Sequence, residues 1–210
     1  MSLTKIGVLI SGSGTNLQSL IDNTRNGHIN GKIEVVISNK KDAYGLKRAE
    51  NNGIDSLYIN RKEFDSDLEF NRKIIEELKK RNIELVVLAG YLKILSHEFV
   101  REYKNRIINI HPSLIPSFCG KGYYGKKVHQ AVLEYGVKVT GATVHFVDEG
   151  TDTGPIILQK TVNVDTNDTV ETLQKKVLKI EHEILPEAVK LYCDRKLKIK
   201  GRKVEVSVSS

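Results

Sequence analysis

Short apolar runs alternate with amphipathic segments of helical length over the first half of the chain. The apolar runs lie at 5–10, 33–38, 56–59, 85–89 and 107–110, and the amphipathic segments at 16–26, 45–52 and 67–81. This alternation is typical of βαβ units with a parallel sheet. Runs such as GVLI, VVIS and LVVLA lack polar alternate positions, as expected for strands that helices cover on both faces. The pattern predicts an α/β fold with a doubly wound, mostly parallel sheet.

The pattern changes after a short helix expected at 128–135. Residues 137–147 and 155–164 are β-rich and alternate, and the acidic loop DEGTDTG joins them, which predicts an antiparallel pair of strands. Apolar residues at helical spacing predict a long helix over 168–192, which Pro186 is able to bend. The basic tail that follows is expected either to form a hairpin about Gly201 or to fray.

Length and composition indicate one folded domain over residues 1–210, with an amino-terminal half to about 105, a second part over 106–192 and a tail over 193–210. Hydrophobic residues make up 40% of the chain and charged residues 28%, which excludes a disordered chain. No apolar run approaches the roughly 18 residues of a membrane span. We therefore expect no membrane partner. Two cysteines cannot form a disulfide framework, so we expect a cytoplasmic location. The net charge of +7 favours anionic partners.

A glycine- and serine-rich turn joins the first strand to the first helix, from Ser11 to Asn16. Backbone N–H groups at such a turn can bind a phosphate, and the hydroxyls of Ser11, Ser13 and Thr15 add donors. The turn lacks the third glycine of a dinucleotide loop, because Leu17 stands there, and it lacks the Gly-Lys ending of a nucleoside triphosphate loop. A phosphate monoester is therefore the favoured ligand, and a tight structural turn is the alternative.

Asn109 and His111 lie two residues apart at the carboxyl end of a predicted strand, so their side chains point to the same side. An amide can hold a developing oxyanion, and a histidine can exchange a proton near neutral pH. The alternative for any one histidine is a hydrogen-bonded structural role. The position beside Asn109, at a strand end closed by Pro112, favours a catalytic role for His111.

The acidic loop over 148–155 offers a carboxylate that can orient the histidine. An ionised Asp152 near His111 is expected to stabilise the imidazolium and so to move the pKa of His111 upward from about 6.5. An ordinary acidic hairpin loop is the alternative, since sequence spacing alone does not bring Asp152 to His111. The acids also resemble a cation-binding loop, but their spacing does not fit an EF-hand.

Five segments, in this order, resemble the phosphoribosylglycinamide formyltransferases, which belong to the formyltetrahydrofolate-dependent formyltransferase family. The resemblance covers nearly the whole chain, from about Lys5 to Tyr192. The segments are SGSGTNL, LAGYLKILS, INIHPSLIPSF, VHFVDEGTDTGPIILQ and IEHEILPEAV.

The resemblance implies formyl transfer from the co-substrate 10-formyltetrahydrofolate to the amine of glycinamide ribonucleotide, without a metal. In this scheme Asn109 holds the formyl oxygen, His111 transfers the proton, and Asp152 tunes His111. The substrate-binding residues would be Gly12, Ser13, Gly14, Thr15, Asn16, Leu17 and Glu181. Asn109 and ten other residues would contact the folate: Leu92, Lys93, Ile94, Leu95, Val147, Asp148, Glu149, Gly150, Thr151 and Asp152. The amino-terminal half would then bind phosphate, and the second part would bind folate and carry the catalytic residues.

Two departures from the family pattern concern cationic residues. Asp67 stands where an arginine is common, and Lys93 replaces an arginine. A carboxylate at 67 cannot supply a cationic contact, and Arg61 or Arg72 is the candidate to supply it instead. The loop over 119–127 is also longer than in many members.

Other formyl-transferring or folate-binding proteins are the competing functions. They are a formyltransferase acting on a sugar nucleotide amine, a hydrolase that uses water, a tRNA formyltransferase, and a non-catalytic phosphoribosyl or folate sensor. A tRNA enzyme needs a nucleic-acid-binding domain, whereas one helix and a short tail make up most of the segment after Asp152, so no nucleic acid partner is expected. The chain is expected to be a monomer or a homodimer.

Overall fold

The computed structural model describes residues 2–207, which form two compact units that divide between Ile108 and Asn109. This division lies three residues from the one expected near 105. Residues 208–210 of the predicted tail lie outside the described residues. That the whole chain acts as one domain stays a prediction.

Unit 1 contains a parallel sheet with the strand order β3-β2-β1-β4. Its strands are β1 (Thr4–Ile10), β2 (Gly31–Ser38), β3 (Asp55–Tyr58) and β4 (Leu85–Leu88). The apolar residues of β1 and β4 are buried without alternation, as the uninterrupted apolar runs predict. Packing explains why a glycine stands at position 7 of β1, because a Cβ there would lie 2.6 Å from Cδ2 of Leu78.

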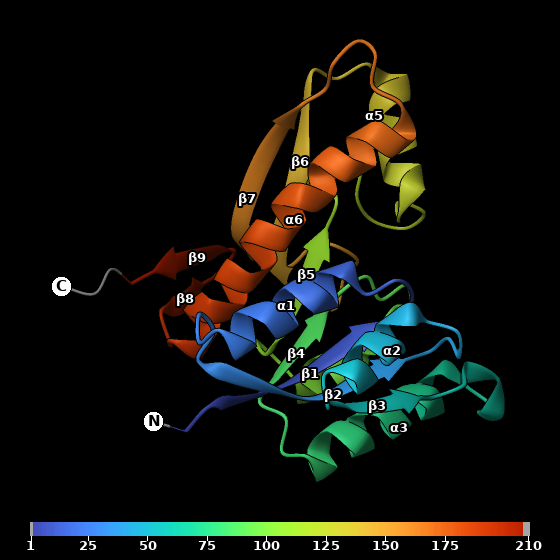
Figure 1. The fold of residues 1–210 in the computed structure, drawn as a ribbon, viewed down its shortest axis with the longest axis vertical. Coiled ribbons are helices and arrows are strands. Elements are labelled where there is room, and N and C mark those ends of the chain that lie inside the picture. The colour runs from blue at the N-terminus through green and yellow to red at the C-terminus, as the bar shows by residue number, and fades with distance from the viewer. Residues whose placement is uncertain (1, 208–210) are drawn as a thin grey trace. The chain divides into compact units, whose positions relative to one another are not determined.

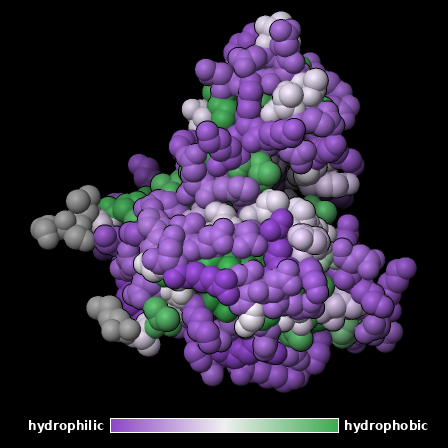
Figure 2. Space-filling view, in the orientation of Figure 1, coloured by the Kyte–Doolittle hydropathy of each residue, from purple (hydrophilic) through white to green (hydrophobic). Residues whose placement is uncertain are grey.

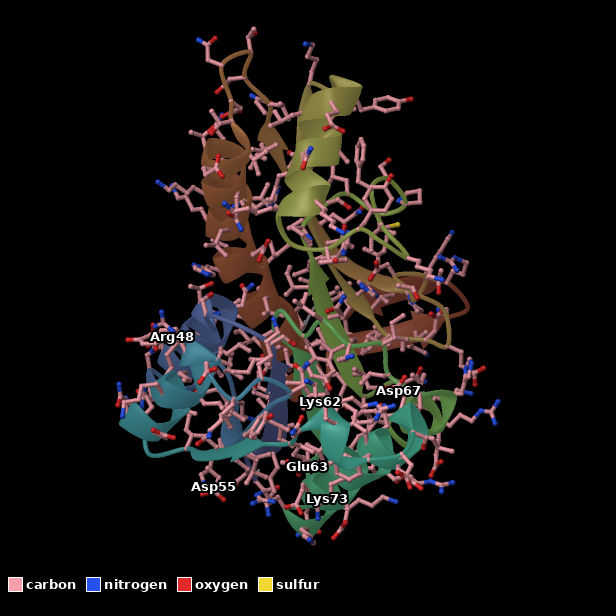
Figure 3. The ribbon with its side chains drawn as sticks, turned by 90° about the vertical axis from the view of Figure 1, so that its right-hand side faces the viewer. Arg48, Asp55, Lys62, Glu63, Asp67 and Lys73 are labelled. Atoms are coloured by element: carbon pink, nitrogen blue, oxygen red, sulfur yellow. The ribbon has the colours of Figure 1, made fainter. Side chains whose placement is uncertain are left out.

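Helices cover both sides of the unit 1 strands. They are α1 (Thr15–Arg25), α2 (Tyr44–Asn51), α3 (Asp67–Lys80) and α4 (His97–Glu102), with a short 3₁₀ helix η1 (Arg61–Glu63). The helices α1 and α2 pack together, and α3 packs against α4. Figure 3 shows Arg48 of α2 and Asp67 of α3 on opposite sides of the unit. Ser66 and Ser96 cap α3 and α4, since each hydroxyl accepts a backbone N–H of the first turn.

Unit 2 holds the remaining strands in the order β5-β6-β7-β9-β8. They are β5 (Ile107–His111), whose first two residues belong to unit 1, and β6 (Val139–Phe146), β7 (Ile156–Asn163), β8 (Leu197–Lys200) and β9 (Lys203–Val206). The pairs β6–β7 and β8–β9 are antiparallel. The helix α6 (Val170–Cys193) lies along β6 and β7, and α5 (Lys126–Tyr135) packs against α6 (Figure 1). The apolar face of α6 supplies much of this core.

These arrangements confirm the predicted fold class, including the antiparallel carboxy-terminal portion. Of the two alternatives left open for the tail, the hairpin about Gly201 is the one present. The long helix continues through Pro186. Two elements were not predicted, α4 and η1, and α5 begins two residues earlier than expected, at Lys126. Within the described residues, no helix is long and apolar enough to cross a membrane. The face shown in Figure 2 is mostly hydrophilic, with small separate hydrophobic patches.

Candidate functional site

The predicted site residues fall into two groups, one in each unit. In unit 1 the turn from β1 to α1 is held by the side chain of Ser11. Its hydroxyl accepts the N–H of Leu92 at 2.9 Å and donates to Oδ1 of Asn39 at 2.6 Å. Ser11 is also buried. The prediction that this hydroxyl is a phosphate donor is therefore wrong, because it joins the loops that follow β1, β2 and β4.

The two glycines of the turn have different surroundings. Gly14 has a φ of +70°, and a Cβ there would lie 2.6 Å from Cα of Gly45 in α2. A Cβ on Gly12 would meet nothing within 4 Å. Gly14 is thus required for the fold of the turn, whereas Gly12 and Ser13 form its exposed part. The helix α1 has no side-chain cap, which leaves backbone N–H groups of its first turn for another acceptor.

Arg48 also contacts this turn, and the sequence reasoning missed it. Its Nε donates to the carbonyl of Ser13 at 2.9 Å, its Nη1 lies 3.2 Å from Oε1 of Gln18, and its guanidinium stacks on the ring of Tyr44. Arg48 therefore places a permanent positive charge beside the exposed part of the turn. No local motif indicates this contact, because 35 residues separate Arg48 from Ser13.

The predicted folate-contacting segment of unit 1 follows β4. Leu92 and Ile94 are exposed apolar side chains, with 49% and 70% of their surfaces accessible, and Lys93 is exposed beside them. Arg61 forms an ion pair with Asp67, and Arg72 with Glu98. Both arginines proposed to compensate for Asp67 thus already have acidic partners.

In unit 2 the three predicted catalytic side chains lie close together. Nδ1 of His111 is 3.6 Å from Oδ2 of Asp152, and Nε2 of His145 is 3.7 Å from Oδ1 of the same carboxylate. Nδ2 of Asn109 lies 3.1 Å from Nε2 of His145. The fold therefore joins Asn109, His111 and Asp152 into one polar network, and His145 is a member that the sequence reasoning did not select.

Backbone groups from the segment after the cis peptide bond Ile115–Pro116 complete this network. Nε2 of His111 donates to the carbonyl of Phe118 at 3.0 Å, because a carbonyl can only accept. Gly120 donates its N–H to Oδ2 of Asp152 at 2.8 Å. Asp152 itself has a φ of +57°, a conformation that carboxamide and carboxylate residues tolerate better than most. The loop over 119–127 thus contacts the Asp152 carboxylate directly.

Burial has the largest effect on the pKa of His111. It lowers the pKa of this imidazole and outweighs the rise that the Asp152 carboxylate and the Phe118 carbonyl cause. The prediction of a net upward shift is wrong, although Asp152 contributes with the predicted sign. Burial also acts to raise the pKa of Asp152, but the neighbouring His145 side chain, the charge of His111 and the Gly120 N–H lower it below its usual range. The site thus pairs a neutral imidazole with an ionised carboxylate at neutral pH.

The remaining predicted residues of unit 2 lie on the loop after β6 and on α6. Oδ1 of Asp148 accepts from the Gly150 N–H and the Thr153 hydroxyl, so this carboxylate holds the loop in shape. Val147 is partly buried, and Glu149, Gly150 and Thr151 are exposed. Glu181 of α6 is only 8% accessible, so it does not lie on an exposed polar face of this helix. A buried carboxylate has a specific role more often than a solvated one. Among residues 2–207 no group of three or more metal-ligating side chains is arranged to hold a metal ion.

Comparison with known proteins relates the chain to enzymes that transfer formyl groups. A family model described as "Formyl transferase" matches residues 4–189. The chain is 41% identical to "Phosphoribosylglycinamide formyltransferase" of Haemophilus influenzae over 198 residues, covering 94% of this chain and 91% of that protein. It is similar to the crystal structure of glycinamide ribonucleotide transformylase 1 from Symbiobacterium toebii, with a TM-score of 0.93 and 46% identity, covering 98% of this chain and 94% of that one.

Some relatives are much longer than this chain. The human "Trifunctional purine biosynthetic protein adenosine-3" is 46% identical over 187 residues, which is 89% of this chain but 18% of the human protein. The similarity to that protein therefore concerns one of its parts.

Proposed function

The chain belongs to the formyl transferase family, and from this premise we propose that it transfers a formyl group from 10-formyltetrahydrofolate to the amine of glycinamide ribonucleotide. The products are formylglycinamide ribonucleotide and tetrahydrofolate, and the reaction is a step of purine biosynthesis. The observation that carries the proposal is the network of Asn109, His111 and Asp152 in unit 2 of a chain from this family. A sensor that only binds ligands has no need of these three groups together.

Formyl transfer requires the site to stabilise two charges that develop during the reaction. Attack of the amine on the formyl carbon places negative charge on the formyl oxygen and positive charge on the nitrogen. The amide N–H of Asn109 is a neutral donor suited to the oxygen. Collapse of the tetrahedral intermediate breaks the bond to the folate nitrogen, which takes up a proton as it leaves.

His111 is suited to move that proton. Because burial lowers its pKa, the imidazole is neutral at neutral pH and acts first as a base toward the attacking amine. Its Nδ1 faces the Asp152 carboxylate at 3.6 Å, so the imidazolium that forms is stabilised by an ion pair in a buried setting. His111 then returns the proton to the leaving nitrogen. Asp152 thus stabilises the charged form of His111, which at neutral pH forms during the reaction.

The phosphate of the ribonucleotide is assigned to the turn between β1 and α1. Three features favour an anion there: the exposed Gly12 and Ser13, the uncapped start of α1, and the positive charge of Arg48. Glu181, a carboxylate, suits the amine or the ribose of the same substrate.

The formyl donor is assigned to two segments on grounds of their chemistry. The exposed apolar side chains of Leu92 and Ile94 suit a pterin ring, and Lys93 suits a carboxylate of the folate tail. The loop over 147–152 in unit 2 is assigned to the folate from the family resemblance. A cytoplasmic location, a monomeric or homodimeric state, and the absence of a metal and of a nucleic acid partner stay predictions.

An assay with competing acceptors tests the proposal. Purified protein is incubated with 10-formyltetrahydrofolate and glycinamide ribonucleotide, with a sugar nucleotide amine, or without an amine, and the products are identified by mass spectrometry. We expect formylglycinamide ribonucleotide in the first reaction and no comparable product in the others. Faster formylation of the sugar nucleotide, or free formate at the same rate without an amine, would overturn the proposal. Asn109→Ala serves as the control with strongly reduced activity, and Asp194→Asn, at the ion pair with Lys190, serves as the active one.

A further inference from the structure

His145 lies in the centre of the unit 2 network, yet the scheme above gives it no role. It belongs to β6 and is 1% accessible. Its Nδ1 lies 2.8 Å from the carbonyl oxygen of Phe146. A carbonyl oxygen can only accept a hydrogen bond, so Nδ1 carries the proton. In a neutral imidazole the other nitrogen, Nε2, then presents a lone pair.

The partner of that lone pair is the amide of Asn109. Nδ2 of Asn109 lies 3.1 Å from Nε2 of His145, and an amide nitrogen can only donate. The bond therefore requires an unprotonated Nε2, in agreement with the proton on Nδ1. These two hydrogen bonds assign a single tautomer, with a donor toward its own backbone and an acceptor toward Asn109. Oδ1 of Asp152 lies 3.7 Å from the same Nε2, which is outside hydrogen-bond distance.

This acceptor selects one of the two orientations of the Asn109 amide. In the observed orientation one N–H of Nδ2 points to His145, and the second N–H of the same nitrogen is directed elsewhere. A turn of the amide by 180° would place its oxygen against the lone pair of Nε2, and the two would repel each other. The same turn would exchange a donor for an acceptor at the position where negative charge develops on the formyl oxygen.

We propose that His145 is a positioning residue, which fixes the Asn109 amide so that its free N–H stabilises the formyl oxygen in the transition state. This proposal rests on the proposed function, because it assigns a role within that reaction. His145 touches no reacting atom in this role. It acts through Asn109, and its effect belongs to turnover more than to substrate binding.

Two near-isosteric substitutions separate this role from a structural one. In His145→Asn the amide nitrogen lies near the former Nδ1, so the bond to the Phe146 carbonyl can persist while the acceptor for Asn109 is lost. In His145→Gln the amide oxygen lies near the former Nε2, so the acceptor persists while the backbone contact is lost. We expect kcat to fall by roughly 10- to 100-fold in His145→Asn, with both KM values within about threefold, and by less than about fivefold in His145→Gln. If the role were structural, His145→Asn would be the more active variant, and this order would overturn the proposal.

A double mutant identifies the residue through which His145 acts. In an Asn109→Ala background, His145→Asn should cause less than a twofold further loss of kcat, because the group that it positions is absent. A further loss equal to that in the wild-type background contradicts the proposal.

The tautomer can be measured without any substrate. In protein with ¹⁵N-labelled histidine, long-range ¹H–¹⁵N spectra should show Nδ1 of His145 protonated and Nε2 unprotonated, and His145→Gln supplies the assignment. A protonated Nε2 would overturn the proposal even if formyl transfer is confirmed. A correct tautomer together with no formyl transfer would refute the proposed function and leave the hydrogen-bond assignment intact.

Discussion

Gly120 donates its backbone N–H to Oδ2 of Asp152, the same oxygen that lies 3.6 Å from Nδ1 of His111. One carboxylate oxygen therefore joins the loop after β5 to His111, the proposed catalytic histidine. This contact stabilises the ionised form of Asp152, because a hydrogen bond to a carboxylate favours its charge. The loop over 119–127 thus contributes to the electrostatics of the site through its backbone, whatever its side chains are.

Asp152→Asn tests the coupling of Asp152 to His111. The substitution keeps the shape and removes the charge that raises the pKa of His111, so the titration of this ring, followed by NMR, should move to lower pH than in the wild type. Turnover should fall by roughly 10² to 10⁴-fold, with little change in the binding of either substrate. Asp194→Asn is the matched control in the same unit. Near-wild-type turnover with an unmoved His111 titration would leave Asp152 as a loop residue.

The sequence predicts the part of the site that lies on one strand. Asn109 and His111 are two residues apart, and the period of a strand places both on one side. Asp152 is 41 residues further along the chain, so only the folded unit brings it to His111. The Phe118 carbonyl and the Gly120 N–H are backbone groups that no residue type indicates. The pKa of His111 was predicted wrongly because the loss of solvation depends on burial, which the sequence pattern does not quantify.

The fold was predicted best where apolar runs are long. The uninterrupted apolar runs of β1 and β4 identify buried strands, and the apolar face of α6 repeats at helical spacing over enough residues to identify a helix. The helix α4 has six residues, less than two turns, so its periodicity is too short to recognise. Both alternatives for the tail were open from the sequence, and the structure pairs β9 with β8 and places it beside β7.

The two glycines of the β1–α1 turn should respond differently to substitution. Gly12→Ala adds a methyl group in open space, so the protein should keep its melting temperature while KM for the ribonucleotide rises, because the group obstructs the approach of the phosphate. Gly14→Ala should cost about 1–2 kcal/mol or more of unfolding free energy, because its φ is +70° and its Cβ meets Gly45. Thermal melts and substrate titrations of both variants check this. An unchanged ribonucleotide affinity in Gly12→Ala would argue against the phosphate assignment.

Glu181→Gln tests the buried acid of α6. The substitution preserves volume and removes charge, so we expect KM for the ribonucleotide to rise by at least tenfold while KM for the folate changes less than twofold. Glu183→Gln, two residues along and exposed in an ion pair with Lys160, should leave both constants unchanged. Steady-state kinetics with each substrate varied in turn provide the measurement. Equal rises of both constants for Glu181→Gln would indicate a structural role.

His129 makes the stability of the protein depend on pH. This side chain of α5 is 2% accessible, and burial lowers its pKa to about 4, with a smaller contribution from the charge of His111. In the unfolded chain the pKa of a histidine is about 6.5, so between pH 6.5 and 4 the unfolded state binds a proton that the folded state excludes. Stability should therefore decrease as the pH falls through this window, by roughly 3 to 4 kcal/mol at most from this residue. Below pH 4 this residue should contribute no further decrease.

Glutamine does not titrate, so His129→Gln should remove this contribution and flatten the dependence of unfolding free energy on pH between 6.5 and 4. The buried His111 contributes in the same direction and remains in the variant, so the slope should decrease without reaching zero. His28→Gln is the matched control, since it makes the same substitution at an exposed histidine. Urea titrations at half-unit intervals of pH give the free energies. Equal slopes in His129→Gln and the wild type would mean that His129 takes up its proton in the folded state as readily as in the unfolded chain, and so that its burial does not oppose protonation.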